Sequence, residues 1–137
     1  IALNDNAFLS KDMKVRTLVE GRGDVHHIFP KNYLQKNGKN NMSVYNQIAN
    51  FALIQTETNL QISDMSPKEY MQIVNTQCNS KGNEIGSINE KDKLLENLKI
   101  NCIPESLYLM NVDDYDSFLK QRRILMAKKI KDYYNTL

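Results

Sequence analysis

The sequence contains few residues of the kinds that build structural metal sites. It has two cysteines and two histidines in 137 residues. Cys78 and Cys102 lie far apart and outside any Cys-x-x-Cys spacing, whereas a zinc knuckle needs four closely paired ligands. The sequence therefore argues against a structural zinc site, and two free thiols in a reducing cytosol are the simpler interpretation.

Long apolar runs and a strong excess of charge are also missing. No run approaches the roughly 18 apolar residues that a membrane span requires. Asn4, Asp5 and Asn6 interrupt the start, so it does not read as a signal peptide. We therefore expect a cytoplasmic protein with no membrane partner. The formal net charge is only +2, so any surface for nucleic acid must come from local clustering of basic residues.

What is present is ordinary globular composition, with 41% hydrophobic and 25% charged residues. A chain of this length has enough residues for one domain with a real core, but not comfortably for two. We predict a single domain over residues 1–137. Because the first residue is Ile1 and not Met, we also expect this domain to be a fragment of a longer chain.

Local patterns predict short elements first and long helices later. We expect a helix over residues 10–20, capped by Ser10, and a short strand over 24–29 that ends at Pro30. Ser66-Pro67-Lys68-Glu69 predicts a strong helix start, with a capping box and a proline at the first helical position. The other expected elements are a loop over 36–43, a strand over 48–54, a helix from 67 through 74, a polar loop over 79–87 and a helix over 90–98.

The last segment is the clearest helix. It opens at Asp113 or Asp114 and would be about 22 residues long, or roughly 33 Å at 1.5 Å per residue. Its tyrosines and methionines are expected in the core, and its basic residues (Arg122, Arg123, Lys128, Lys129 and Lys131) are expected more often on a solvated face. The fold class is therefore α+β and mostly helical, with one two-stranded element near the histidines and a long C-terminal helix.

The two histidines, His26 and His27, are adjacent. On a strand, neighbouring side chains point to opposite faces, which would prevent both from serving one site. At a strand end before Pro30 that restriction relaxes. Taken alone, the pair is as compatible with a solvated or structural role as with chemistry.

The surrounding residues form a longer pattern. Asp24-Val25-His26-His27-Ile28-Phe29-Pro30 is followed by Asn50-Phe51-Ala52-Leu53-Ile54, and Asn59 lies nine positions after Asn50. This resembles the HNH (ββα-metal) endonuclease family. Its pattern is an acidic residue or His, then His, Ile and a nearby Pro, followed by a strand that opens on Asn and a helical His or Asn nine residues later.

A narrower resemblance is to the HNH domain of GmrSD-type restriction proteins. It is carried by residues 45–50, by Thr58-Asn59 and Ile62-Ser63, and more loosely by the C-terminal segment around Arg122-Arg123 and Tyr133-Tyr134. It covers residues 21–75 best, which we expect to be the core motif, with 76–137 as a helical extension. In those proteins a ParB-like nucleotide-hydrolysing domain precedes the HNH domain, so the resemblance implies such a domain upstream.

The resemblance assigns roles residue by residue. His26 and Asn59 would bind one divalent metal ion (Mg, Mn, Ni or Zn), and His27 would be the general base that deprotonates the attacking water. Asn50 would tie the two strands together and help to orient His27. The implied function is metal-dependent DNA cleavage that leaves 5′-phosphate and 3′-hydroxyl ends, in prokaryotic restriction or anti-phage defence.

Several alternatives stay open. Asp24 could orient a histidine from behind, or it could be a turn residue after Gly23, which is slightly favoured. Lys31, Lys36 and Lys39 could contact DNA phosphates. The domain as a whole could instead be a catalytically weak HNH-like module that binds nucleic acid or a partner. A more remote interpretation is a helical interaction module whose histidines are incidental.

Overall fold

The computed structural model describes residues 3–21 and 23–137. Within them the fold is mixed α/β and mostly helical, as expected from the sequence, with a two-stranded antiparallel sheet of β1 (Gly23–His27) and β2 (Phe51–Gln55). In this sheet His26 pairs with Ala52 and His27 pairs with Phe51. The helices and 3₁₀ turns are α1 (Val15–Glu20), α2 (Lys31–Lys36), α3 (Met42–Tyr45), η1 (Ile48–Asn50), α4 (Thr56–Ile62), α5 (Pro67–Ser80), α6 (Lys91–Ile100), η2 (Glu105–Leu109), η3 (Val112–Asp114) and α7 (Tyr115–Asn135).

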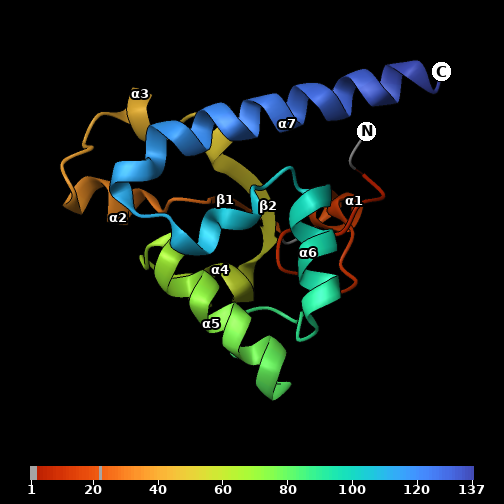
Figure 1. Cartoon of the computed structure of the whole chain (residues 1–137), viewed down its shortest axis with the longest axis horizontal. Helices are drawn as coiled ribbons and strands as arrows, with labels where there is room; N and C mark the ends of the chain where they lie inside the picture. Colours follow the sequence, from red (N-terminus) through yellow and green to blue (C-terminus); the bar gives the residue numbers. More distant parts are fainter. Residues whose placement is uncertain (1–2, 22) are drawn as a thin grey trace.

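The sheet sits in the middle of the molecule, with α4 and α5 on one side of it and α7 on the other (Figure 1). Gly23 lets β1 start close to α1, because a Cβ at this position would lie 2.5 Å from the Cβ of Leu18. In β2 the buried positions alternate, with Ala52 and Ile54 facing inward. Alternation in β1 likewise turns His26 inward and leaves Val25 exposed.

One hydrophobic core joins the sheet to the helices. It includes residues from Phe8 to Leu119, and the ring of Phe29, just after β1, packs against Tyr115 and Phe118 of α7. The hydroxyl of Tyr70 on α5 donates a 2.6 Å hydrogen bond to the carbonyl of Ile28. The end of β1 is therefore fixed from α5 and from α7 at once.

Helix α7 has two unlike halves (Figure 1). All its buried residues (Tyr115, Phe118, Leu119 and Arg122) lie in its first half, whereas its C-terminal half extends past the rest of the molecule. Tyr133 and Tyr134 are 47% and 68% exposed, so their predicted core positions were wrong. Arg122 was expected more often on a solvated face and is instead 5% exposed.

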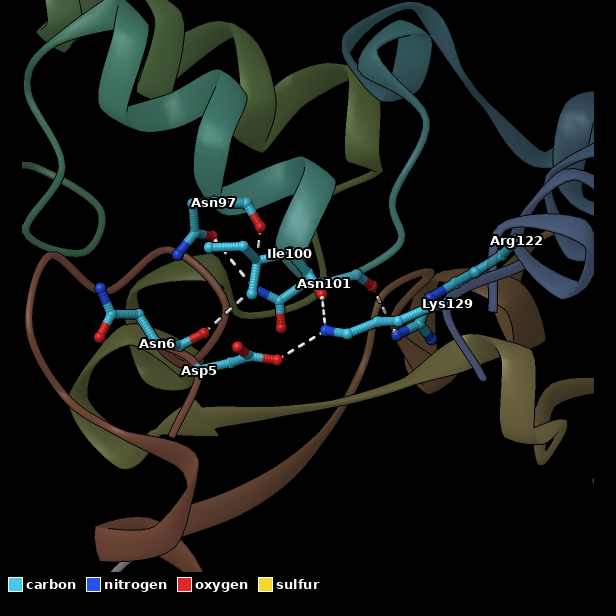
Figure 2. Close-up of polar contacts among 7 residues, drawn as sticks. All are labelled: Asp5, Asn6, Asn97, Ile100, Asn101, Arg122 and Lys129. Carbon is cyan, nitrogen blue, oxygen red and sulfur yellow. Dashed lines mark hydrogen bonds and ion pairs between the residues drawn. The ribbon is translucent and has the colours of Figure 1, made fainter. Parts of the chain in front are cut away.

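A set of polar contacts, here called the α7 network, is made by Asp5, Asn97, Asn101, Arg122 and Lys129. It connects α6 and α7 to the N-terminal segment (Figure 2), and Arg122 extends it to β2. Arg122 donates to the carbonyl oxygens of Ala49 and Phe51 and, at 3.1 Å, to that of Asn101. Lys129 pairs with Asp5 at 2.6 Å. Burial lowers the pKa of Arg122 from 12.5 to about 10, which leaves it charged at pH 7.

Several predicted elements are confirmed, and others shift. Ser66 and Glu69 form the predicted capping box, and α6 and α7 lie where the sequence places them. The predicted helix over 10–20 was wrong at its start, because Asn6 and Lys14 form a β-bridge around a buried loop and α1 begins only at Val15. Other shifts are small: residues 48–50 form η1 ahead of β2, α5 runs on to Ser80, and α3 begins inside the predicted 36–43 loop.

In the described part of the chain, no helix combines the length and the apolar character that crossing a membrane requires.

Candidate functional site

A pocket of about 190 Å³ opens where β1 ends, between α2 and α4. It brings together residues that are distant in sequence, and we call it the histidine pocket. A larger and mainly apolar pocket of about 280 Å³ lies beneath α7 and is lined by neither histidine. The histidine pocket is lined by Val25, His26, His27, Pro30, Lys31, Asn32, Asn59 and Ser63.

His26 forms the inner wall of this pocket. It is 2% exposed, and its Nδ1 lies 2.9 Å from the Oδ1 of Asn59. The ring sits between Phe8, at 5.9 Å, and Tyr70, at 6.1 Å, and its Nε2 is buried without a hydrogen-bond partner among the described residues. Burial lowers the pKa of His26 from 6.5 to about 4, so its imidazole is neutral at pH 7.

Asn59 reaches the pocket from α4 and is itself held from behind. Its Nδ2 donates a 3.3 Å hydrogen bond to the Oδ2 of Asp24, while its Oδ1 faces His26. Asp24 therefore orients the asparagine, and not a histidine. The turn interpretation was wrong, because Asp24 lies in β1, paired with Ile54.

His27, the last residue of β1, is partly exposed on the other side of the strand end. Its ring makes T-shaped contacts with Phe51 at 4.9 Å and Tyr45 at 6.1 Å. Its Nε2 lies 2.8 Å from the Oδ1 of Asn46. Sequence reasoning missed Asn46, since it is one of many asparagines in this stretch and only the tertiary fold brings it to His27.

Asn50 lies behind the pocket, fully buried in η1. Its Oδ1 accepts a 2.8 Å hydrogen bond from the N–H of Phe29, and its Nδ2 donates to the carbonyls of Phe29 and Tyr45 at 3.1 and 3.2 Å. Asn50 is not among the pocket's lining residues. It therefore clamps the backbone that follows His27 to the backbone that precedes Asn46.

Of the three lysines considered for phosphate contacts, Lys31 lines the pocket. Its Nζ lies 5.4 Å from the centre of the Tyr45 ring. Lys36 is paired with Asp64 at 2.6 Å, which lowers the pKa of that carboxyl group. Lys39 lies over Tyr115 instead. Lys31 is therefore placed to meet a ligand in the pocket, whereas Lys36 and Lys39 have partners outside it.

In the structure the Nδ1–H of His26 donates to the Oδ1 of Asn59, so Nδ1 could bind a metal only with the ring proton moved to Nε2. With the proton on Nε2, the two atoms have the spacing of neighbouring ligands on one divalent ion. Neighbouring ligands of an octahedral ion with bonds of about 2.1 Å lie about 3.0 Å apart, and the Nδ1 to Oδ1 distance is 2.9 Å. A neutral imidazole and an amide oxygen both coordinate such ions. Residues 3–21 and 23–137 contain no group of three or more His, Cys, Asp or Glu side chains placed to bind a metal, so this pair would provide two neutral ligands.

No family model and no solved structure matches the chain. An uncharacterized protein of Methanocaldococcus jannaschii is 32% identical over a 118-residue alignment, which covers 77% of this chain and 20% of that protein. The chain thus spans about a fifth of the length of this relative.

Proposed function

We propose that this chain is a metal-dependent DNA endonuclease domain of the HNH type, which hydrolyses phosphodiester bonds. The observation that carries the proposal is the convergence of His26, His27 and Asn59 in one pocket. They come from the end of β1 and from α4, and β2, which pairs with β1, leads directly into α4. The order strand, strand, helix agrees with the family resemblance.

His26 and Asn59 are the residues that would hold the ion. When bound, a divalent ion stabilises negative charge on the phosphoryl oxygens and on the departing 3′ oxygen. Because both ligands are neutral, the ion would keep its full charge for the phosphate. Asp24 fixes the amide of Asn59 so that its oxygen, and not its nitrogen, faces His26.

His27 is the proposed general base, and it removes a proton from the attacking water. Its partial exposure gives water access, whereas His26 is buried. Lys31, on the rim of the same pocket, would attract a phosphate of the DNA backbone. Asn50 supports the site from behind by holding the backbone on both sides of it.

The biological setting is proposed from the resemblance to GmrSD-type chains. It comprises restriction or anti-phage defence in a prokaryotic cytoplasm, DNA as the partner, and a ParB-like nucleotide-hydrolysing domain upstream. Products with 5′-phosphate and 3′-hydroxyl ends belong to the same proposal.

A second candidate is an HNH-like module that binds nucleic acid without cutting it. The observation that favours it is the ligand set, because two neutral ligands without a carboxylate would bind metal weakly. The two candidates differ in whether metal-dependent cleavage occurs.

The test is nicking of supercoiled plasmid in Mg²⁺, Mn²⁺ or Ni²⁺, with a chelator control. We expect His27→Ala to reduce the rate by about 10²- to 10⁴-fold, the usual contribution of a general base. Lys31→Ala should raise KM for DNA, whereas Lys36→Ala, which changes a lysine outside the pocket, should not.

If His27→Ala nicks plasmid at the wild-type rate, His27 is not the general base and the proposed mechanism is wrong. Wild-type protein that binds plasmid but does not nick it with any of the three metals would favour the binding module instead.

A further inference from the structure

We infer that Asn46 is a positioning residue that fixes the tautomer of His27, so that the basic lone pair lies on Nδ1. The tautomer follows from the orientation of the Asn46 amide, whose Oδ1 faces the ring. Its consequence for cleavage rests on the proposed function.

The contact itself determines the proton position. The Oδ1 of Asn46 lies 2.8 Å from the Nε2 of His27. An amide oxygen can only accept a hydrogen bond, so Nε2 must carry the proton. A neutral imidazole has one protonated and one unprotonated nitrogen, which leaves Nδ1 with the free lone pair. Nδ1 is therefore the atom available to take a proton from water.

Asn46 is well placed for this because its own backbone is held on both sides. Its N–H donates a 2.9 Å hydrogen bond to the carbonyl of Met42, closing the last turn of α3. The preceding carbonyl, that of Tyr45, accepts from the buried Asn50. The amide of Asn46 thus stands on a fixed backbone, although its side chain is exposed.

The remaining contacts of His27 restrict its ring plane but not its proton. Phe51 and Tyr45 pack against the ring at 4.9 and 6.1 Å in T-shaped geometry. Such ring contacts do not discriminate between the two tautomers. The choice between Nδ1 and Nε2 therefore depends on Asn46, and its neutral amide fixes the tautomer without placing an added negative charge beside the phosphate.

The experiment compares Asn46→Leu, which removes the acceptor at similar size, with Asn46→Asp, which keeps an oxygen there. Asn40→Leu, in the exposed loop before α3, is the matched control. Long-range ¹H–¹⁵N spectra of the histidine rings at pH 8 report which nitrogen carries the proton. Plasmid nicking reports kcat and KM, and thermal unfolding reports folding.

For wild type, Asn46→Asp and Asn40→Leu we expect His27 in the Nε2–H form. In Asn46→Leu we expect a mixture of tautomers, with kcat reduced about 10- to 100-fold and KM for plasmid unchanged. Asn46→Asp should recover most of that loss.

Wild-type His27 protonated on Nδ1, or a folded Asn46→Leu with an unchanged tautomer and kcat, would overturn the inference. If no variant nicks but the Nε2–H form is lost only in Asn46→Leu, the role of Asn46 stands and the nuclease proposal fails. The spectra thus separate the two failures.

Discussion

The histidine pocket and the α7 network are both polar clusters in a mainly apolar molecule, but they are bonded differently. In the α7 network, side chains bond mainly to backbone: Arg122 to three carbonyls, and Asn97 to the N–H of Leu9 and the carbonyls of Ala7 and Ser10. In the pocket, side chains bond to one another. His26 bonds to Asn59, and His27 bonds to Asn46.

The difference indicates what each cluster does. Contacts between two side chains are only about 10–15% of the hydrogen bonds in folded proteins. When a side chain that bonds to a buried backbone N–H or carbonyl moves away, that group loses its hydrogen-bond partner. Each such loss costs about 1–3 kcal/mol. Two side chains at an open pocket can separate and take other partners. The α7 network therefore stabilises the fold, and the pocket is the cluster suited to exchange.

The largest effect on stability should come from Asn97. Asn97→Ala leaves the N–H of Leu9 and the carbonyl of Ser10 without partners and removes one of two donors to the carbonyl of Ala7. We expect it to lower the free energy of unfolding by about 3 kcal/mol. Urea unfolding measures this, with Asn40→Ala as an exposed control. Nicking by the folded fraction should equal that of wild type. If folded Asn97→Ala nicks more slowly, the α7 network also serves the histidine pocket, and the two clusters do not have separate roles.

Arg122 tests whether the two regions are separable. It belongs to the α7 network, yet two of its carbonyl partners, on Ala49 and Phe51, flank Asn50. We expect Arg122→Met to cost about 2 kcal/mol of stability and also to slow nicking at a temperature where the protein is folded. Lys120→Met removes an exposed charge from the same helix and should do neither. If Arg122→Met lowers the stability but not the nicking rate, the α7 network and the histidine pocket are independent of each other.

Metal binding should stabilise the pocket by a smaller amount. At a Mn²⁺ or Ni²⁺ concentration ten times the Kd, linkage predicts about 1.4 kcal/mol of added stability. His26→Ala and Asn59→Ala should abolish the increase, because each removes one ligand. The thermal midpoint with and without metal measures this. An increase that survives in both variants would place the ion elsewhere.

The smallest effect concerns Tyr115 at alkaline pH. Burial raises its pKa to about 12, and its hydroxyl donates to the carbonyl of Val44 at 2.6 Å. A folded pKa above the unfolded value of about 10 means that stability is fully present below pH 10 and is lost as pH rises towards 12. We expect a loss of about 1 kcal/mol between pH 9 and 11. In Tyr115→Phe this part of the pH dependence should be absent.

Where the residues that start a helix lie within one turn of each other, the sequence predicted the position of that helix. Ser66, Pro67 and Glu69 define the start of α5 by contacts within one turn. Of the two asparagines in the predicted pattern, Asn59 contacts His26, whereas Asn50 lies behind the pocket and bonds to the backbone of Phe29 and Tyr45. The α7 network could not be predicted, because its contacts join distant residues: Asn97 bonds to Leu9 across 88 positions. Asn46, the partner of His27, was missed for the same reason, because the two residues lie 19 positions apart.

The direct junction between β2 and α4 also limits how this domain can vary. Gln55 ends the strand and Thr56 begins the helix, so no spacer absorbs a change in length. Each residue of an α-helix turns the chain by about 100° and advances it by 1.5 Å. A single residue inserted after Gln55 would therefore swing Asn59 away from His26, whereas the loop between α2 and α3 could lengthen without moving either side chain.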